Sequence, residues 1–411
     1  MRISLAVPRR AFRGGGATAG VLLCTALAFA QPDPSSIQPL RTMPVEKLTV
    51  NPGFRDWGPT TIAGTTILGG NPTNRGGLFA IDMGTGKVKW SFRPVFSSGT
   101  ASVSTAPAVS GDIVITPFAA AYPGAVVAVS LATGKEVWRG PDPAQGATIA
   151  VGSGVAYVLG KDHTFYALDA TTGHEKWKTS FARDNCDSAP LVRDGIVYVG
   201  GNVLLRAADA NRSASYYRYL FALDANTGQE RWRYPDAPQA GVVSGICLSQ
   251  PVLTADTFFA VAGASLYAVN LATGRERWKP AEVRRPVDGR VRAVEVHGLV
   301  DAGPVLVGLT TGFLIGFDKT TGQTAWEVPG QYYETSPSTA VAGRVLYVQG
   351  QPGGGPAAQR RGTLNAIDLD TRAVLWSFSR PTAEPNWAFG YVTPVNGGLW
   401  VDSYQALVKL Q

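Results

Sequence analysis

Apolar and polar residues alternate in short runs along most of the chain, and these runs recur with a long period. One example is Tyr166-Ala167-Leu168-Asp169, which is followed by Thr172-Gly173 and then by Trp177. Alternation with period two predicts a strand with one buried face. The Asp and the Thr-Gly pair predict a tight turn, because Asp accepts hydrogen bonds from turn amides and Gly adopts a positive φ without strain.

The pattern occurs seven times, so seven of the ten tryptophans occupy one position of a repeat of about 48 residues. Internal repeats of this length are typical of propellers and related arrays. Each indole is expected at the edge of its repeat, where it packs against the next one. The tryptophans are Trp90, Trp138, Trp177, Trp232, Trp278, Trp326 and Trp376, and the turn glycines are Gly86, Gly134, Gly173, Gly228, Gly274 and Gly322.

A second hairpin precedes each unit, as in residues 189–200 with its Asp194-Gly195 turn. Four antiparallel strands per repeat make a propeller blade. The last unit has a hairpin at 393–401 and a third strand at 405–410, and the segment Val45–Val50 is expected to supply its fourth strand. The sequence therefore predicts an all-β, eight-bladed propeller of four-stranded antiparallel blades, with seven blades as the alternative. One domain is expected over residues 45–411, closed without open sheet edges.

Composition agrees with this fold class and excludes others. The chain is 45% hydrophobic and only 16% charged, with 48 Gly and 28 Pro, which is typical of a turn-rich β protein and excludes a disordered one. The net charge is +7, and four of the arginines lie in residues 1–30, which contain no Asp or Glu. The remaining charge of +3 is too small to indicate a nucleic-acid partner.

Residues 1–30 have the features of a signal peptide, and residues 31–44 form an N-terminal extension. A basic start is followed by an apolar run too short to span a membrane, and by a small-x-small cleavage site that ends at Ala30. Arg9-Arg10 is compatible with a twin-arginine signal or an ordinary one, and Cys24 leaves lipidation open. A periplasmic or secreted protein is expected, with no transmembrane segment after cleavage.

The Ala-x-Asp-x-x-Thr-Gly-x-x-x-Trp motif resembles the repeats of pyrroloquinoline-quinone-type propellers, over essentially residues 45–411. The resemblance implies the fold and two different functions. One is that of the quinoprotein dehydrogenases, which hold the quinone and calcium on the propeller axis and oxidise alcohols or sugars. The other is non-catalytic, as in the propeller lipoprotein of the outer-membrane barrel-assembly machinery, which binds other proteins.

In four-stranded blades, the connections into the first strand and between the second and third strands lie on one face. The long insertions fall there, namely 70–75, 118–124, 202–218 and 351–361, and we call this the long-loop face. It is expected either to be the working surface or to carry tolerated insertions. A protein or peptide partner is expected to contact Phe54, Arg55, Tyr332, Tyr333 and Glu334, unless these aromatic residues pack under the loops.

The quinoprotein alternative has its own candidate residues. The segment Gly70–Arg75 is similar to the one whose asparagine ligates calcium, so the resemblance implies Asn71 as a metal ligand, with Arg75, Trp57 and Trp387 near the cofactor. Asn-Pro also begins ordinary loops. The family's adjacent cysteines and its base segment are absent, so no catalytic residue is identified. The acidic side chains expected on the same face are Asp56, Asp184, Asp187 and Glu334.

Cys186 and Cys247 each lie four residues before a first-strand proline, in neighbouring repeats. In an oxidising compartment this pair predicts a disulfide, with two buried free thiols as the alternative. Taken together, these patterns favour an exported propeller that acts as a binding or scaffold module. The alternative is an oxidoreductase that uses pyrroloquinoline quinone and calcium.

Overall fold

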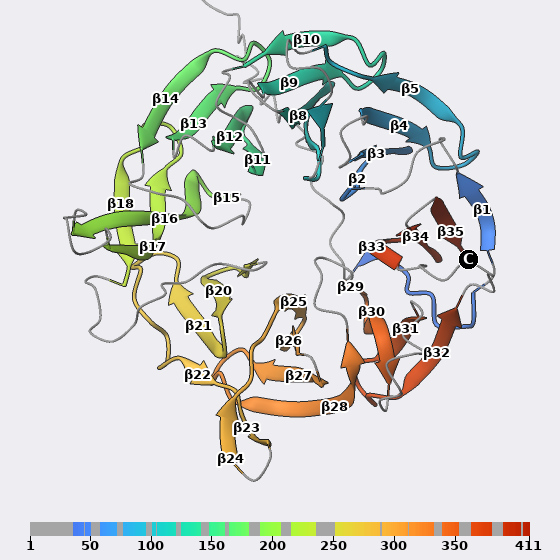
Figure 1. Ribbon diagram of the computed structural model, residues 1–411, viewed down its shortest axis with the longest axis vertical. Coiled ribbons are helices and arrows are strands. Elements are labelled where there is room, and N and C mark those ends of the chain that lie inside the picture. The colour runs from blue at the N-terminus through green and yellow to red at the C-terminus, as the bar shows by residue number, and fades with distance from the viewer. Residues whose placement is uncertain are drawn as a thin grey trace, which may run out of the picture.

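The computed structural model describes residues 36–44, 46–50, 58–71, 77–95, 101–103, 105–120, 125–140, 148–160, 164–180, 190–206, 215–235, 251–287, 290–310, 312–332, 339–352, 363–379, 389–403 and 406–411. These residues form eight antiparallel blades arranged in a ring around a central axis (Figure 1). No helix long and apolar enough to cross a membrane occurs among them. The predicted eight-bladed, all-β propeller is confirmed, and the seven-bladed alternative is wrong.

The first four blades follow one another along the chain. Blade 1 contains β2 (Thr61–Ala63), β3 (Thr66–Gly70), β4 (Leu78–Asp82) and β5 (Val88–Phe92). Blade 2 contains β7 (Ala108–Ser110), β8 (Ile113–Ala120), β9 (Ala125–Ser130) and β10 (Glu136–Arg139), and β6 (Ala101–Ser102) also pairs with β8. Blade 3 contains β11 (Thr148–Gly152), β12 (Val155–Leu159), β13 (Thr164–Asp169) and β14 (Glu175–Ser180). Blade 4 contains β15 (Leu191–Arg193), β16 (Ile196–Arg206), β17 (Ser215–Asp224) and β18 (Glu230–Tyr234).

The remaining blades include one inserted hairpin. Blade 5 contains β19 (Val252–Leu253), β20 (Thr257–Ala262), β21 (Ser265–Asn270) and β22 (Ala281–Glu282), and is followed by the hairpin of β23 (Arg284–Val287) and β24 (Arg290–Ala293). Blade 6 contains β25 (Gly298–Ala302), β26 (Val305–Leu309), β27 (Phe313–Asp318) and β28 (Thr324–Tyr332). Blade 7 contains β29 (Thr339–Ala342), β30 (Val345–Pro352), β31 (Thr363–Asp368) and β32 (Val374–Ser379). Blade 8 contains β33 (Phe389–Val395), β34 (Gly398–Ser403), β35 (Leu407–Leu410) and β1 (Glu46–Val50).

The ring closes through its N-terminal strand. β1 pairs antiparallel with β35, with Glu46 opposite Leu410 and Val50 opposite Leu407, as the sequence predicts. This pairing completes blade 8 from the two ends of the propeller chain. It also covers the outer edge of β35, which would otherwise present unpaired backbone groups.

The turn between the third and fourth strands has the same geometry in most blades. The Oδ1 atom of Asp169 accepts hydrogen bonds from the amides of Thr171 and Thr172, at 3.0 and 2.9 Å, and from the Thr172 hydroxyl at 3.0 Å. Gly173 follows with φ of 74°. Asn270 accepts the same three bonds in blade 5, so an amide oxygen serves as well as a carboxylate.

Five of the motif tryptophans, on the outer strand of one blade, donate a hydrogen bond to a carbonyl in the turn of the next blade. The Nε1 atom of Trp177 donates to the Ala225 carbonyl at 3.0 Å, and Trp138 does the same to Ala170. A Cβ atom added to Gly228 would lie 2.5 Å from the Trp177 ring, so this turn accepts only glycine beside the indole. The repeated turn therefore joins neighbouring blades.

Residues 36–44 take the place of this turn at the closure. The Leu40 carbonyl accepts the hydrogen bond from Trp376 Nε1 at 3.0 Å. The Leu40 amide donates to the Tyr347 hydroxyl at 2.6 Å, and Arg41 forms an ion pair with Asp368. Ile37 and Leu40 are buried. The segment thus packs against blades 7 and 8.

The propeller is expected to become less stable in acid, because the aspartates of the turns lose their charge. Backbone amides, with Thr371 first, and then Arg41 lower the pKa of Asp368 to about 2. Because this pKa lies below its ordinary value of 3.8, the carboxylate stabilises the fold above about pH 4, and the contribution is lost as the pH falls towards 2.

We expect Asp368→Asn to be less stable at pH 7 than the parent chain and to lose less stability between pH 5 and 2. The amide keeps the turn bonds, as Asn270 shows, but it lacks the charge that pairs with Arg41. Urea unfolding across this pH range measures the difference. An acid slope equal to that of the parent chain would contradict the prediction.

Candidate functional site

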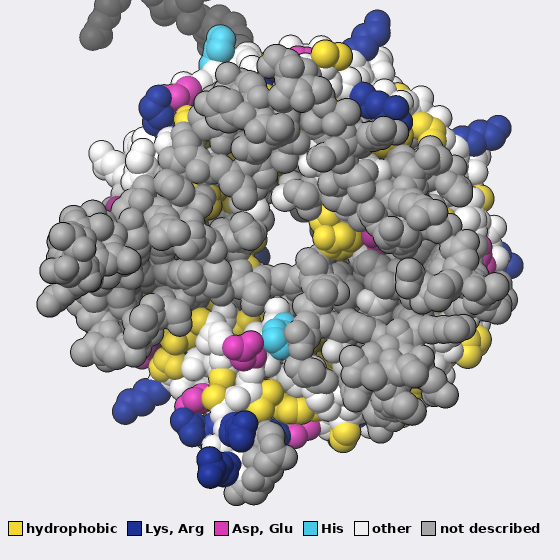
Figure 2. All heavy atoms as spheres, viewed as in Figure 1, with side chains coloured by type: hydrophobic (Ala, Val, Ile, Leu, Met, Phe, Trp, Pro, Cys, Tyr) yellow, Lys and Arg dark blue, Asp and Glu magenta, His cyan; other side chains and the backbone are white. Residues whose placement is uncertain are grey.

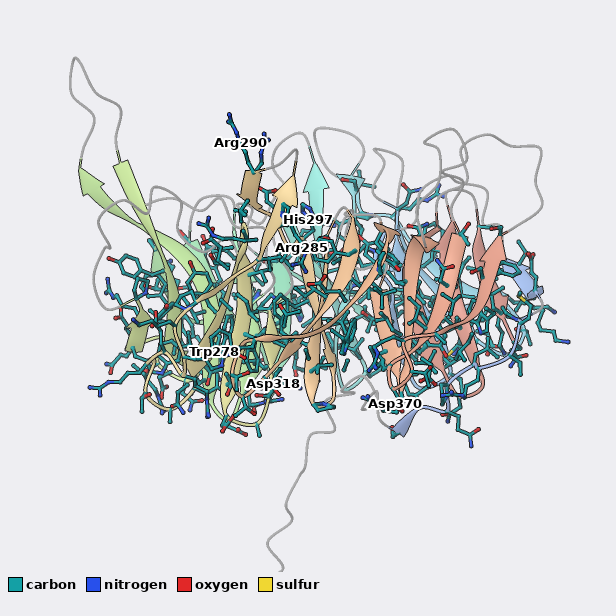
Figure 3. All side chains as sticks on the ribbon, turned by 90° about the horizontal axis from the view of Figure 1, so that it is seen from below. Trp278, Arg285, Arg290, His297, Asp318 and Asp370 are labelled. Carbon is teal, nitrogen blue, oxygen red and sulfur yellow. The ribbon has the colours of Figure 1, made fainter. Side chains whose placement is uncertain are left out.

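The long-loop face is the candidate site, and its described part consists of strands that extend above the ring. Figure 3 shows β16 and β17 rising on one side of the ring, where Arg290 of the inserted hairpin also lies. Asp318 and Asp370, which belong to the Thr-Gly type turns, lie towards the opposite side.

β16 and β17 form the longest ribbon. They pair from Ile196 opposite Asp224 to Arg206 opposite Ser215. β15 pairs with β16 only as far as Tyr198, and β18 pairs with β17 only from Leu220. Among the described residues, 201–206 and 215–218 therefore form strand pairs only with one another, so the described strands leave both outer edges of this part of the ribbon open.

Asn71 lies directly after β3 and is buried, with 1% of its surface exposed. Its amide donates to the Gly77 carbonyl at 3.1 Å, and its carbonyl accepts from the Val103 amide at 2.8 Å. These bonds join blade 1 to the segment that leads into blade 2. The other predicted cofactor residues, Arg75, Trp57 and Trp387, lie outside the described residues, so the predicted cofactor site stays a prediction.

Tyr332 differs from the expectation of an exposed partner contact. It is 3% exposed, and burial raises its pKa to about 12. The reason is that β28 runs on beyond blade 6 and pairs with β30 of blade 7, with Tyr332 opposite Gly350. Its ring then lies in the apolar layer between these blades. The burial of Tyr332 agrees with the alternative that these aromatic residues pack under the loops.

Several further predicted residues lie outside the described part of the chain. They are the partner-face residues Phe54, Arg55, Tyr333 and Glu334, the acidic candidates Asp56, Asp184 and Asp187, and the cysteine pair Cys186 and Cys247. Within the described residues, no three His, Cys, Asp or Glu side chains gather as a metal site would require.

The central channel has an apolar cavity of about 340 Å³ in its wall. First strands of several blades line it, with Ile62, Val300 and Val392 among the side chains. Its polar lining includes the Thr60 and Thr393 hydroxyls, which lie 3.0 Å apart. Figure 2 shows the ring open at its centre, with hydrophobic side chains on one side of the opening.

The chemistry of this cavity can be compared with what the quinone cofactor requires. Pyrroloquinoline quinone carries carboxylates, and with calcium it needs charged or strongly polar partners. None of the described residues lining the cavity is charged. This cavity therefore does not fit the cofactor.

The hairpin of β23 and β24 was missed by the sequence reasoning. Its signal is Asp288-Gly289, a pair typical of a two-residue hairpin turn, followed by the alternating run Arg290-Val291-Arg292-Ala293. Blade 5, which precedes this hairpin in the chain, also departs from the repeat pattern. Its fourth strand is reduced to β22 and an isolated bridge from Glu276 to Val269, although Trp278 still donates to the Lys319 carbonyl at 3.2 Å.

Comparison with known proteins adds family information to this geometry. The family model described as outer membrane protein assembly factor BamB matches residues 59–146 and 122–378. Outer membrane protein assembly factor BamB of Burkholderia pseudomallei is 30% identical over 246 residues, which cover 55% of either chain. Tetrathionate hydrolase of Acidithiobacillus ferrooxidans is 25% identical over 247 residues, 56% of this chain and 47% of the relative.

The chain thus spans about half the length of these relatives. Among solved structures, a europium-containing methanol dehydrogenase superposes with a TM-score of 0.62 at 14% identity, over 87% of this chain and 84% of the other. A likeness at this identity shows the fold alone.

Proposed function

The chain belongs to the family of outer membrane protein assembly factor BamB, and we propose that it is an exported binding or scaffold propeller that acts through its long-loop face. Its partner is a protein or an extended peptide. The relative from Burkholderia pseudomallei is named for outer-membrane protein assembly, which supports a protein partner. The signal-peptide features of residues 1–30 support a periplasmic or secreted site of action.

The observation that carries this proposal is the ribbon of β16 and β17. Beyond Tyr198 and Leu220 both of its edges are open among the described residues. An open edge offers unpaired N–H and C=O groups, to which an extended segment of another protein adds as a further strand. The rigid ring below holds the ribbon in place, so binding does not have to order it.

Photo-crosslinking tests the proposal in cells that express the full chain. A photoreactive residue at Val203 or Tyr217, which lie opposite each other in the ribbon, is expected to form covalent adducts with a protein. Lys87 and Lys135 are matched controls, because both are exposed and follow turns on the opposite face. Adducts from the controls alone, or from no position, would overturn the proposal.

The alternative is an oxidoreductase that uses pyrroloquinoline quinone and calcium. It depends on residues outside the described part of the chain, and the apolar cavity beside Thr60 and Thr393 does not favour it. Titration of the mature protein with the quinone, with and without calcium, separates the two functions by tryptophan fluorescence. We expect no saturable, calcium-dependent quenching. Quenching at a stoichiometric ratio would favour the oxidoreductase instead.

A further inference from the structure

The hairpin of β23 and β24 stands on a fixed base at the top of blade 5. In this blade the second and third strands are joined by a tight turn, with Gly263 at φ of 58°. The amides of Val283 and Val296 donate to the carbonyls of that turn, Ala264 and Gly263, each at 2.9 Å. Both valines are buried in the layer between blades 5 and 6. The base of the hairpin is therefore part of the core.

The strands above this base are rich in arginine. Four of the nine residues from Arg284 to Arg292 are arginines. Arg285 lies directly opposite Arg292, and Arg290 is two residues from Arg292, so these three side chains share one face of the hairpin. Like charges directly opposite one another destabilise an antiparallel pair. Negatively charged groups bound to this face of the hairpin would reduce the repulsion between these arginines.

Only part of this charge is neutralised within the chain. Arg285 forms an ion pair with Glu327 and lies over the Phe313 ring, 5.0 Å from its centroid. Arg290 and Arg292 are exposed, and among the described residues neither has an ion-pair partner. Figure 3 shows Arg290 pointing away from the ring, and Figure 2 shows Lys and Arg side chains gathered at the lower rim.

Three cations on the outer strands of blades 2, 3 and 4 form ion pairs within their own strand, unlike Arg290 and Arg292. Arg139, Lys178 and Arg233 each form an ion pair with a glutamate three residues earlier on the same strand. These glutamates belong to the repeated Glu-x-Trp pattern, which the hairpin lacks. Arg290 and Arg292, which have no ion-pair partner among the described residues, thus differ from these three cations.

The backbone of β24 is also available. Pro286 lies opposite Val291, and a proline fits only where the opposed residues exchange no hydrogen bonds. The N–H and C=O groups of Val291 therefore point to the outer edge of β24, which pairs only with β23 among the described residues. Val291 is 63% exposed. β24 combines an open edge with arginines at alternate positions.

We propose that β24 docks an acidic, extended segment of a protein partner, which pairs along the strand edge and places carboxylates at alternate residues near Arg290 and Arg292. This inference rests on the proposed function and specifies the chemistry of its partner. The alternate arginines repeat at about 7 Å along the strand, which matches alternate side chains of an extended peptide. A membrane surface offers no such strand to pair with Val291.

Fluorescence anisotropy of a labelled peptide of alternating Glu and Thr, added to the mature protein, tests the proposal. We expect saturable binding that weakens in 0.5 M salt, because exposed charge pairs are screened. The double variant Arg290→Glu with Arg292→Glu is expected to weaken binding at least 10-fold. Lys87→Glu with Lys135→Glu changes the net charge equally on the opposite face and is expected to change binding less than 2-fold.

A third variant separates strand pairing from charge. Val291→Pro removes the outward N–H group without altering any charge, and we expect it to weaken peptide binding several-fold. Thermal melting confirms that each variant is folded. Equal losses in both charge-reversed pairs, or binding unchanged in Arg290→Glu with Arg292→Glu, would overturn the proposal. The proposal would also be overturned if the protein bound phosphatidylglycerol vesicles through Arg290 and Arg292 but did not bind the peptide.

Failure of this proposal is distinguishable from failure of the proposed function. Crosslinks from Val203 and Tyr217 report on the long-loop face without involving the hairpin. If those crosslinks form while the acidic peptide does not bind, the binding function stands and the assignment of β24 is wrong. If the peptide binds but neither position crosslinks, the assignment of β24 stands and the ribbon is not the contact.

Discussion

Replacing Trp177 with alanine is expected to lower the free energy of unfolding by about 3–5 kcal/mol, the usual loss when a buried large aromatic residue is removed. The indole is 9% exposed, and its ring lies 5.9 Å from those of both Tyr157 and Phe165. It also donates to the Ala225 carbonyl of the next blade at 3.0 Å. The substitution opens a cavity at a junction between blades and leaves this carbonyl without its donor.

Urea unfolding followed by circular dichroism measures this loss. Val137→Ala is the control, because Val137 lies on the corresponding outer strand of blade 2 and is 47% exposed. It is expected to change stability by less than about 0.5 kcal/mol. Equal effects of the two substitutions would show that the indole does not hold the blades together.

Removing residues 31–50 from the mature chain is expected to cost about 5–9 kcal/mol. The deletion takes away three buried aliphatic side chains, Ile37, Leu40 and Val50, each contributing about 1.5–3 kcal/mol. It also removes the fourth strand of blade 8 and the acceptor of the Trp376 hydrogen bond. The edge of β35 is then exposed, so aggregation on heating is expected as well.

Differential scanning calorimetry measures this second effect. A chain that lacks only residues 31–35 is the control, because it keeps every described residue, and its melting temperature is expected to be unchanged. A synthetic peptide of residues 36–50, added in trans, is expected to restore part of the loss. Equal melting temperatures for the two truncated chains would mean that β1 and residues 36–44 do not stabilise the ring.

The fold was predictable because its signal is local and repeated. The turn at Asp169 is made by side-chain bonds to residues two and three positions away and by backbone bonds to Gly173 and His174, so a short motif determines it wherever it occurs. Seven copies of that motif then imply seven similar units, and the incomplete eighth unit needs a strand from elsewhere. β1 supplies it, as the pairing with β35 shows.

The candidate site was less predictable, because it depends on contacts between distant segments. Tyr332 is an aromatic residue next to a long loop, which suggests exposure, but the pairing of β28 with β30 buries it. The role of Leu40 as the acceptor for Trp376 depends on residues more than 300 positions apart in the sequence. The periodic pattern along the chain does not predict a contact between residues so far apart in the sequence.

By itself, the sequence determined the blades and their turns, since these follow from short-range hydrogen bonds and period-two burial. It also determined the strand that closes the ring, because the last repeat lacks its fourth strand. Only the tertiary structure decided which residues face solvent beside the ring. Tyr332 is buried between blades 6 and 7. Val283 and Val296, below β23 and β24, are hydrogen-bonded to the turn at Gly263. Arg290 and Arg292 have no carboxylate partner among the described residues. The reason is physical: burial and charge pairing depend on which segments meet in space, and that is set by the packing of whole blades.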